Sequence, residues 1–396
     1  LRDSGALQQL RERHARHFLM LAERAYPGLQ GPLVQEWLTR LERERDNVRF
    51  ALEWCQDLAD RSYLGLQLAG ALWPYWQLRG HFSEGRTWLA MFLTLPYPLA
   101  TPATTARAHL AAGWLAYSQD DYAAAAHDSR ASLELYRRER KGAGQADALN
   151  LLGFCSAAQG DYTTAIAQLA ESVALARVAG QPYTLAFALL NLGFLFADQE
   201  DIERAIELFE ESLLWARRIH HPVLITRALN GLGELARLQG DYRRAEAYYT
   251  QSLKIYEVLA DRRGLAALHH NLGCVALFHG DATQAHERFR CSLTGYHELG
   301  DASGVAAGLA GLAGVFALQG QATQAARLFG AAYAAREAMR VPFIVPDLRD
   351  YERSLATLRA QLGQIAFDAA WVQGQLLSLE YALAEVSGQS QLELSY

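Results

Sequence analysis

The chain has 396 residues with a hydrophobic content of 51% and a charged content of 20%, which is typical of an ordered, soluble protein. Its net charge of −6, without a basic stripe, argues against nucleic-acid binding. No apolar run reaches membrane-spanning length, and four cysteines without metal-type spacing predict reduced thiols and a cytoplasmic location.

Residues 1–61 are expected to form a helical linker or cap, because they lack the repeat that follows them. Residues 13–23 have the spacing of one amphipathic helix, and residues 37–54 read as two helices that meet near Asp46. The chain opens on Leu1 within what reads as a helix, so we expect it to be a piece of a longer protein.

A forty-residue repeat fills residues 62–340. Five successive units carry a glycine, then an acid eight residues later, an alanine after twelve and a serine after nineteen. The five glycines are Gly113, Gly153, Gly193, Gly233 and Gly273. The five acids are Asp121, Asp161, Asp201, Asp241 and Asp281. A degenerate unit begins near Ser62 and a last unit has Ala313 at the glycine position, which gives seven predicted helical pairs. A fixed period of this length is typical of a solenoid.

Residues 146–180 show how one unit builds a helical pair. Gly153 lies inside the first helix, where glycine costs about 1 kcal/mol against alanine, so its recurrence indicates close approach of the second helix of the same pair. Gly160 is expected to end the first helix and Asp161 to cap the second. The pattern resembles the tetratricopeptide repeat, whose usual unit is shorter. We therefore predict an all-α fold without a sheet: a tetratricopeptide-type right-handed superhelical solenoid of about seven forty-residue helical pairs with helical caps.

Motifs outside the repeat carry a second resemblance. They are the helix His14–Glu23, the segment Trp37–Arg49, the entry to the repeats Leu72–Leu89, and Trp371 with Gly374 in a C-terminal segment, residues 341–396, that we expect to cap the last apolar face. These motifs resemble bacterial signal-transducing STAND ATPases, which include regulators with LuxR-type or SARP-type DNA-binding domains. The resemblance implies a sensor region that follows a nucleotide-binding domain and a winged helix. Those upstream parts are absent here, so neither ATP hydrolysis nor DNA binding is implied for this chain.

Catalytic and metal chemistry find little support in the sequence. The two lysines, Lys141 and Lys254, do not stand in a phosphate-binding loop. The paired histidines, of which His269 and His270 are one pair, have no further ligand type at fixed spacing nearby, so no metal site is expected. No nucleophile motif is present. We expect a chain that is not an enzyme and binds no cofactor.

The first helix of each pair lines the groove in tetratricopeptide folds, so residues at fixed offsets from the glycine are the candidate ligand contacts. The position after the glycine is aromatic in three units and becomes Glu234, Cys274 and Gly314 in later ones. Rings would stack on a ligand, and arginines and asparagines would supply hydrogen bonds. The candidates are Arg107, Trp114, Tyr117, Asn150, Phe154, Phe187, Phe194, Arg227, Asn230, Glu234, Arg237 and His270. The alternative, in which the rings only pack between adjacent helices, stays open.

Two functions share this fold. In the first, the chain is an effector-binding sensor that relays binding to the N-terminal ATPase module of its parent protein. In the second, it is a constitutive protein–protein interaction scaffold. The flanking motifs favour the sensor. The effector is unspecified: a small molecule, a peptide or a protein in the groove, with no nucleic acid and no membrane as partner.

Overall fold

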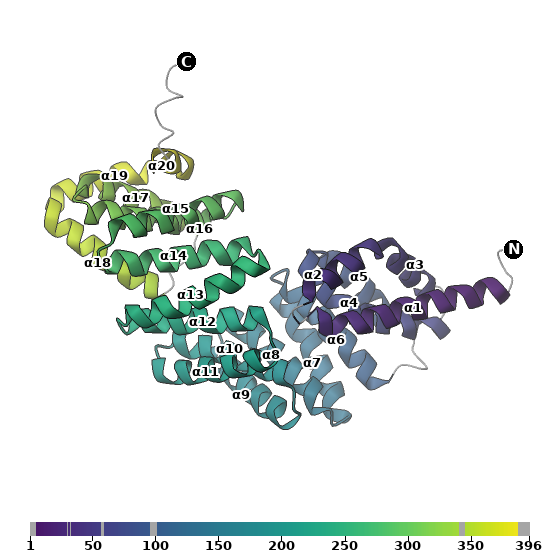
Figure 1. Cartoon of the computed structure of the whole chain (residues 1–396). Helices are drawn as coiled ribbons and strands as arrows, with labels where there is room; N and C mark the ends of the chain where they lie inside the picture. Colours follow the sequence, from purple (N-terminus) through teal and green to yellow (C-terminus); the bar gives the residue numbers. More distant parts are fainter. Residues whose placement is uncertain are drawn as a thin grey trace, which may run out of the picture. The chain divides into compact units, whose positions relative to one another are not determined.

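The computed structural model describes residues 5–29, 31, 33–56, 59–95, 101–339 and 345–386 (Figure 1). That part of the chain holds 20 helices and no strand, which confirms the all-α prediction. The chain divides into two compact units, Leu1–Ile225 (unit 1) and Thr226–Tyr396 (unit 2), and each is described by itself. None of the described helices is long and apolar enough to cross a membrane.

Unit 1 begins with three helices outside the repeat and continues with helical pairs. The first three are α1 (Gly5–Gly28), α2 (Val34–Arg43) and α3 (Arg45–Gln56). The pairs are α4 (Ala59–Arg79) with α5 (Phe82–Thr94), α6 (Pro102–Tyr117) with α7 (Tyr122–Arg138), α8 (Gly142–Ala158) with α9 (Tyr162–Val178), and α10 (Pro182–Asp198) with α11 (Ile202–Arg218). The break between α2 and α3 lies two residues before Asp46, close to the predicted meeting point.

Unit 2 completes the repeat. The helix α12 (Pro222–Leu238) starts in unit 1 and pairs with α13 (Tyr242–Leu259). The further pairs are α14 (Arg262–Phe278) with α15 (Ala282–Glu298) and α16 (Ala302–Leu318) with α17 (Ala322–Met339). The last helices are α18 (Val345–Leu362), α19 (Gln364–Gln375) and α20 (Leu379–Val386). Helices α4 to α11 form four pairs, and helices α12 to α17 form three. The described residues therefore confirm the seven predicted helical pairs.

The recurring acids cap the second helices, as predicted. The carboxylate of Asp161 accepts a hydrogen bond from the backbone N–H of Thr164 at 3.1 Å, and the other four acids accept from the equivalent N–H three residues on. Each such bond satisfies one of the free N–H groups of a helix start. The preceding Gly160 has φ of +81°, the left-handed conformation that glycine adopts without a Cβ clash.

The recurring glycines face the second helix of their own pair, which confirms the close-approach prediction. A Cβ on Gly193 would stand 2.7 Å from the ring of Phe209, and a Cβ on Gly273 would stand 2.8 Å from the ring of Phe289. Both distances are shorter than packed carbon atoms allow. A side chain at these positions would therefore force the two helices apart.

We expect Gly193→Leu to lower the free energy of unfolding by more than about 2 kcal/mol through overpacking against Phe209. The measurement is chemical denaturation followed by far-ultraviolet circular dichroism. The matched control is Leu214→Ala in α11, where the side chain is half exposed and less than about 1 kcal/mol should be lost. A melting temperature equal to that of the parent would show that the helices tolerate a side chain there.

The recurring serines have a structural role that the sequence pattern left unexplained. The hydroxyl of Ser172 in α9 donates to the carbonyl of Ala146 in α8 at 2.7 Å, and Ser212 in α11 donates to Ala186 in α10 at 2.7 Å. These buried hydroxyls need partners, and the first helix supplies its carbonyl. Ser172, Ser212 and Ser252 thus tie the second helix to the first helix of the same pair, whereas the hydroxyls of Ser132 and Ser292 have no hydrogen-bond partner among the described residues.

Two of the C-terminal helices of unit 2, α18 and α19, pack against different parts of the repeat. The helix α19 packs on α17 through a mutual glycine contact, in which a Cβ on Gly374 would overlap the carbonyl of Arg327 and a Cβ on Gly330 the carbonyl of Trp371. This covers the last repeat helix with apolar surface that includes Phe367. The helix α18 instead reaches back toward the first helices of earlier pairs, and that contact shapes the candidate site.

Candidate functional site

An aromatic cluster joins four of the predicted contacts in unit 1. The ring of Trp114 lies 5.8 Å from Phe154 and 6.0 Å from Phe187, and Phe154 and Phe187 lie 5.6 Å apart. Tyr117 adds a contact to Phe154 at 5.5 Å, and Trp73 stacks on the other side of Trp114 at 5.8 Å. All except Trp73 are partly exposed. The rings therefore pack on one another and still present surface.

Two other predicted contacts of unit 1 engage neighbours of their own. Arg107 forms an ion pair with Glu23 at 2.7 Å and lies over the ring of Tyr26 at 4.6 Å. Phe194 packs edge-on against Phe209 of the adjoining helix, with ring centroids 4.9 Å apart. These two side chains therefore make packing and charge contacts within the protein.

A hydrogen bond between two asparagine side chains occurs once in unit 1 and once in unit 2. The side-chain N–H₂ of Asn191 donates to Asn150 at 3.3 Å, and that of Asn271 donates to Asn230 at 2.9 Å. Asn230 in turn donates to Glu234 at 2.6 Å. Asn150 is only 2% exposed, so its amide serves the contact between successive first helices. Asn230 and Glu234 are less buried.

Asp147 in α8 has a raised pKa, and its acid form is favoured by the fold. Burial raises the pKa of this carboxyl to about 6, although the hydroxyl of Thr184 donates to it at 2.6 Å. Because the folded-state pKa lies above the unfolded-state value, the stabilising contribution is complete below about pH 4 and is lost as the pH rises through 6.

We expect Asp147→Asn to raise the free energy of unfolding at pH 7 by up to about 2 kcal/mol, because the amide is neutral and still accepts from Thr184. At pH 4 the variant and the parent should be nearly equal. Denaturant unfolding at both pH values checks this. A gain of the same size at pH 4 would mean that the ionised carboxylate is not the cause. Asp128→Asn, at a carboxylate paired with His109, serves as the control for removing an acid from this unit.

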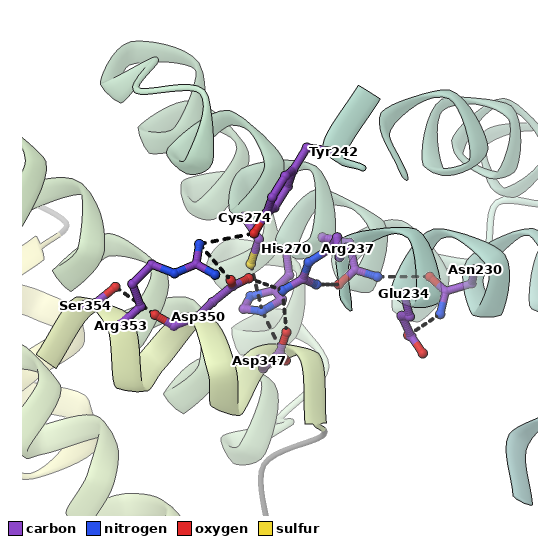
Figure 2. A network of polar contacts seen from close by, with 11 residues as sticks. Asn230, Glu234, Arg237, Tyr242, His270, Cys274, Asp347, Asp350, Arg353 and Ser354 are labelled. Atoms are coloured by element: carbon purple, nitrogen blue, oxygen red, sulfur yellow. Dashed lines mark hydrogen bonds and ion pairs between the residues drawn. The ribbon is translucent and has the colours of Figure 1, made fainter. Parts of the chain in front are cut away.

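Arg237 is the centre of a buried polar network in unit 2 (Figure 2). Its side chain is only 1% exposed, and it donates to Asp350 at 2.6 Å, to Asp347 at 3.1 Å and to Asn271 at 3.4 Å. Both aspartates belong to α18, more than a hundred residues further along the chain. The predicted ligand contact Arg237 is thus occupied by carboxylates of the protein itself. Arg227, on the same helix, is half-buried.

His270 lies on the other side of Asp347. Its Nε2 is 3.4 Å from a carboxylate oxygen of Asp347 and 3.6 Å from the sulfur of Cys274, while Nδ1 has no hydrogen-bond partner among the described residues. Burial by itself would lower the pKa of His270, but Cys274 and Asp347 outweigh it and raise that pKa to about 10. Burial would raise the pKa of Asp347, but His270 and Arg237 hold it well below its usual range.

The exposed edge of this network is formed by Arg353 of α18. Its guanidinium donates to the hydroxyl of Tyr242 at 3.2 Å and lies 3.9 Å from Asp350. Tyr242 stacks on Phe278, and the guanidinium of Arg353 also lies over that ring at 5.7 Å. The start of α18 is therefore held by a buried ion pair and by a more exposed arginine contact.

A cavity of about 440 Å³ lies between the first helices α14 and α16 and the helix α18. Its apolar wall includes Leu277, Phe278, Phe289 and Phe329. Its polar wall includes His270, Cys274, Asp347, Asp350, Arg353 and Ser354. Cys274 and Gly314, which follow the glycine position in two successive repeats, both line it. Arg237 lies outside the lining and acts through Asp347 and Asp350.

Sequence reasoning missed every contribution of α18, because no periodic pattern connects that helix with the repeat. One signal was available in the sequence. Cys274 follows His270 by four residues, one helical turn, so both side chains lie on one face of α14. The prediction that the paired histidines lack a further ligand type nearby overlooked this cysteine.

The repeat itself is identified by comparison with known families. Residues 144–214, 184–257 and 224–298 match the model of the tetratricopeptide repeat. Residues 144–298 are thus tetratricopeptide repeats, and the observed helical pairs give the described chain a tetratricopeptide-type fold, which typically serves as a non-catalytic scaffold for protein interaction. No curated protein sequence matches the chain.

Solved structures with the same fold cover nearly the whole chain. A Rap protein complexed with Competence and Sporulation Factor is 12% identical with a TM-score of 0.60, covering 96% of this chain and 99% of that one. Aspartyl phosphate phosphatase F from Bacillus subtilis is 13% identical with a TM-score of 0.54, covering 83% and 82%. A Signal Transduction ATPase with Numerous Domains (STAND) protein with a tetratricopeptide repeat sensor from Pyrococcus horikoshii is 14% identical with a TM-score of 0.57, covering 92% of this chain but only 55% of that one. At these identities the likeness shows the fold.

Proposed function

We propose that this chain is the effector-binding sensor region of a signal-transducing ATPase of the cytoplasm, without catalytic activity of its own. The observation that carries the proposal is the cavity of unit 2, because it is closed on one side by repeat helices and on the other by α18. A ligand in that cavity would touch both, so its binding energy depends on where α18 lies. The fold likeness to a STAND protein with a repeat sensor supports the proposal.

The lining indicates the chemistry of the effector. Aromatic and aliphatic side chains supply most of the wall, with His270, Arg353 and Ser354 as donors at one end. An effector with an apolar body and an anionic or hydroxyl-bearing end fits this arrangement. Its anionic end would compete with Asp347 for His270, which lines the cavity, and would thereby loosen α18 from the repeat.

Loosening of α18 is the proposed signal. A buried ion pair has two discrete states, made or broken, and a ligand shifts such an equilibrium by its difference in affinity for the two states. The ATPase module of the parent protein would respond to that shift in the position of α18. The predicted contacts of unit 1 and unit 2 outside the cavity remain part of the proposal as further effector contacts.

A constitutive scaffold is the second candidate, and the aromatic cluster of unit 1 favours it. Trp114, Phe154 and Phe187 present partly exposed rings on successive first helices, which suits an extended peptide. A scaffold would bind such a peptide without a change at α18.

The test is a thermal-shift screen of the full chain against metabolites and peptides, followed by hydrogen exchange of each ligand found. A sensor ligand should raise the melting temperature and increase amide exchange in α18. Ala310→Trp, which fills the cavity, should abolish binding, whereas Val178→Trp on the exposed face of α9 should not. Phe154→Ala and Arg227→Ala should each weaken binding if the effector extends beyond the cavity.

A ligand that binds Ala310→Trp as it binds the parent, and leaves exchange in α18 unchanged, would refute the sensor proposal and support the scaffold. Loss of binding in Phe154→Ala alone would place the contact on the aromatic cluster.

A further inference from the structure

Three side chains of different chemistry converge at one end of the cavity. His270 and Cys274 lie one turn apart on α14, and Asp347 reaches them from α18. Their nitrogen, sulfur and oxygen atoms all lie within 4.8 Å of one another. Imidazole, thiolate and carboxylate are the three ligand types that Zn²⁺ takes in proteins.

Two of the three distances between these atoms match the edges of a zinc coordination tetrahedron. Bond lengths of about 2.3 Å to sulfur and about 2.0 Å to nitrogen and oxygen place nitrogen and oxygen about 3.3 Å apart, and nitrogen and sulfur about 3.5 Å apart. The observed separations are 3.4 Å from His270 to Asp347 and 3.6 Å from His270 to Cys274. The sulfur of Cys274 and the carboxylate of Asp347 lie within 4.8 Å of each other, so a cation that binds all three would draw these two groups together.

The surrounding contacts leave one oxygen of Asp347 for such a cation. Arg237 donates to Oδ1 of Asp347 at 3.1 Å, while Oδ2 is the atom that faces His270. The ring of His270 is held edge-on against Phe289 at a centroid distance of 5.5 Å. Contacts outside the ligand set therefore orient two of the three ligands, as they do at established metal sites.

The local charge also suits a divalent ion. With its thiol deprotonated, Cys274 joins Asp347 and Asp350 as a third negative group, and the buried Arg237 is the positive group that faces them. His270 must be neutral to bind the ion, and the buried Arg336 is a second positive group that interacts with Asp347. Three negative charges and two positive charges then leave one negative charge that attracts the cation. Arg353 stands at the exposed rim, where its charge is screened by solvent.

We propose that His270, Cys274 and Asp347 form a binding site for one divalent cation of the Zn²⁺ class. Three protein ligands leave the fourth position open, and all three residues line the cavity, so that position faces the space where an effector would lie. On binding, the thiol proton of Cys274 and the Nε2 proton of His270 pass to solvent, and sulfur–metal and nitrogen–metal bonds form with no change of oxidation state. The ion would join α14 to α18 whatever the effector is.

The experiment titrates the reduced, metal-free full chain with Zn²⁺ against a chromophoric chelator, and in parallel with Co²⁺. We expect a single equivalent of each ion, and with Co²⁺ the ligand-field spectrum of a tetrahedral site together with a thiolate-to-cobalt charge-transfer band. Cys274→Ser should lose that band. His270→Gln and Asp347→Asn should each weaken binding about tenfold or more.

Cys291→Ser is the matched control, because Cys291 is a free cysteine of the same unit outside the ligand set, and it should bind as the parent does. Absence of a charge-transfer band in the parent, or equal affinity in parent and Cys274→Ser, would overturn the metal site. Neither result would contradict the proposal that an effector binds in the cavity, because the chelator titration contains no effector.

Discussion

Replacement of Arg237 by methionine is expected to lower the free energy of unfolding by about 3 kcal/mol and to release α18 from the repeat. The side chain is 1% exposed and bonds two carboxylates, so its removal leaves Asp347 to His270 and Asp350 to the more exposed Arg353. The aspartates are themselves partly exposed, which places the loss at the lower end of the range for broken buried pairs.

Two measurements check this result. Denaturant unfolding gives the loss of stability, and hydrogen exchange shows whether α18 opens before the repeat helices. Arg353→Met is the matched control, because Arg353 contacts Asp350 from a position 59% exposed and should cost less than about 1 kcal/mol. Equal losses in the two variants, or protected amides in α18 of Arg237→Met, would show that the buried ion pair does not hold this helix.

Replacement of Gly374 by alanine is expected to cost more than about 2 kcal/mol, because the added methyl meets backbone and not a side chain that can turn away. A Cβ at Gly374 would overlap the carbonyl of Arg327 in α17, and the reciprocal position, Gly330, faces the carbonyl of Trp371 in the same way. The two helices must therefore separate along their contact. We expect a lower melting temperature and faster amide exchange in α19.

Gly142→Ala provides the comparison, because a Cβ there would have only the methyl of Ala179 nearby, at 4.0 Å. That variant should be neutral or slightly more stable, since alanine favours a helix start more than glycine does. If Gly374→Ala melts at the same temperature as Gly142→Ala, the close contact between α17 and α19 is not needed for stability.

The repeat could be predicted because its determinants are local and recur in register. Asp161 caps α9 through an N–H three residues away, and Gly160 ends α8 through its own backbone conformation. Gly153 and Ala165 report the approach of two helices that are neighbours in the chain. Interactions within about thirty residues leave a periodic signature, so the helical pairs and the seven-fold count follow from the sequence.

The candidate site also combines residues of the repeat with contacts that lie far apart in the sequence. His270, Cys274 and Gly314 line the cavity. The offset from the glycine could not show that Arg237 is closed off by Asp347 and Asp350, which lie more than a hundred residues away and outside the repeat. A single long-range contact leaves no periodic signal in the sequence.

By itself, then, the sequence determined the helical pairs and their caps, because each depends on neighbours in the chain and is repeated. Only the tertiary structure decided which side chains line the cavity of unit 2 and what they contact. The path of α18 rests on the balance between the desolvation of Arg237 and its pairing with two carboxylates, a balance that exists only once these helices have packed together.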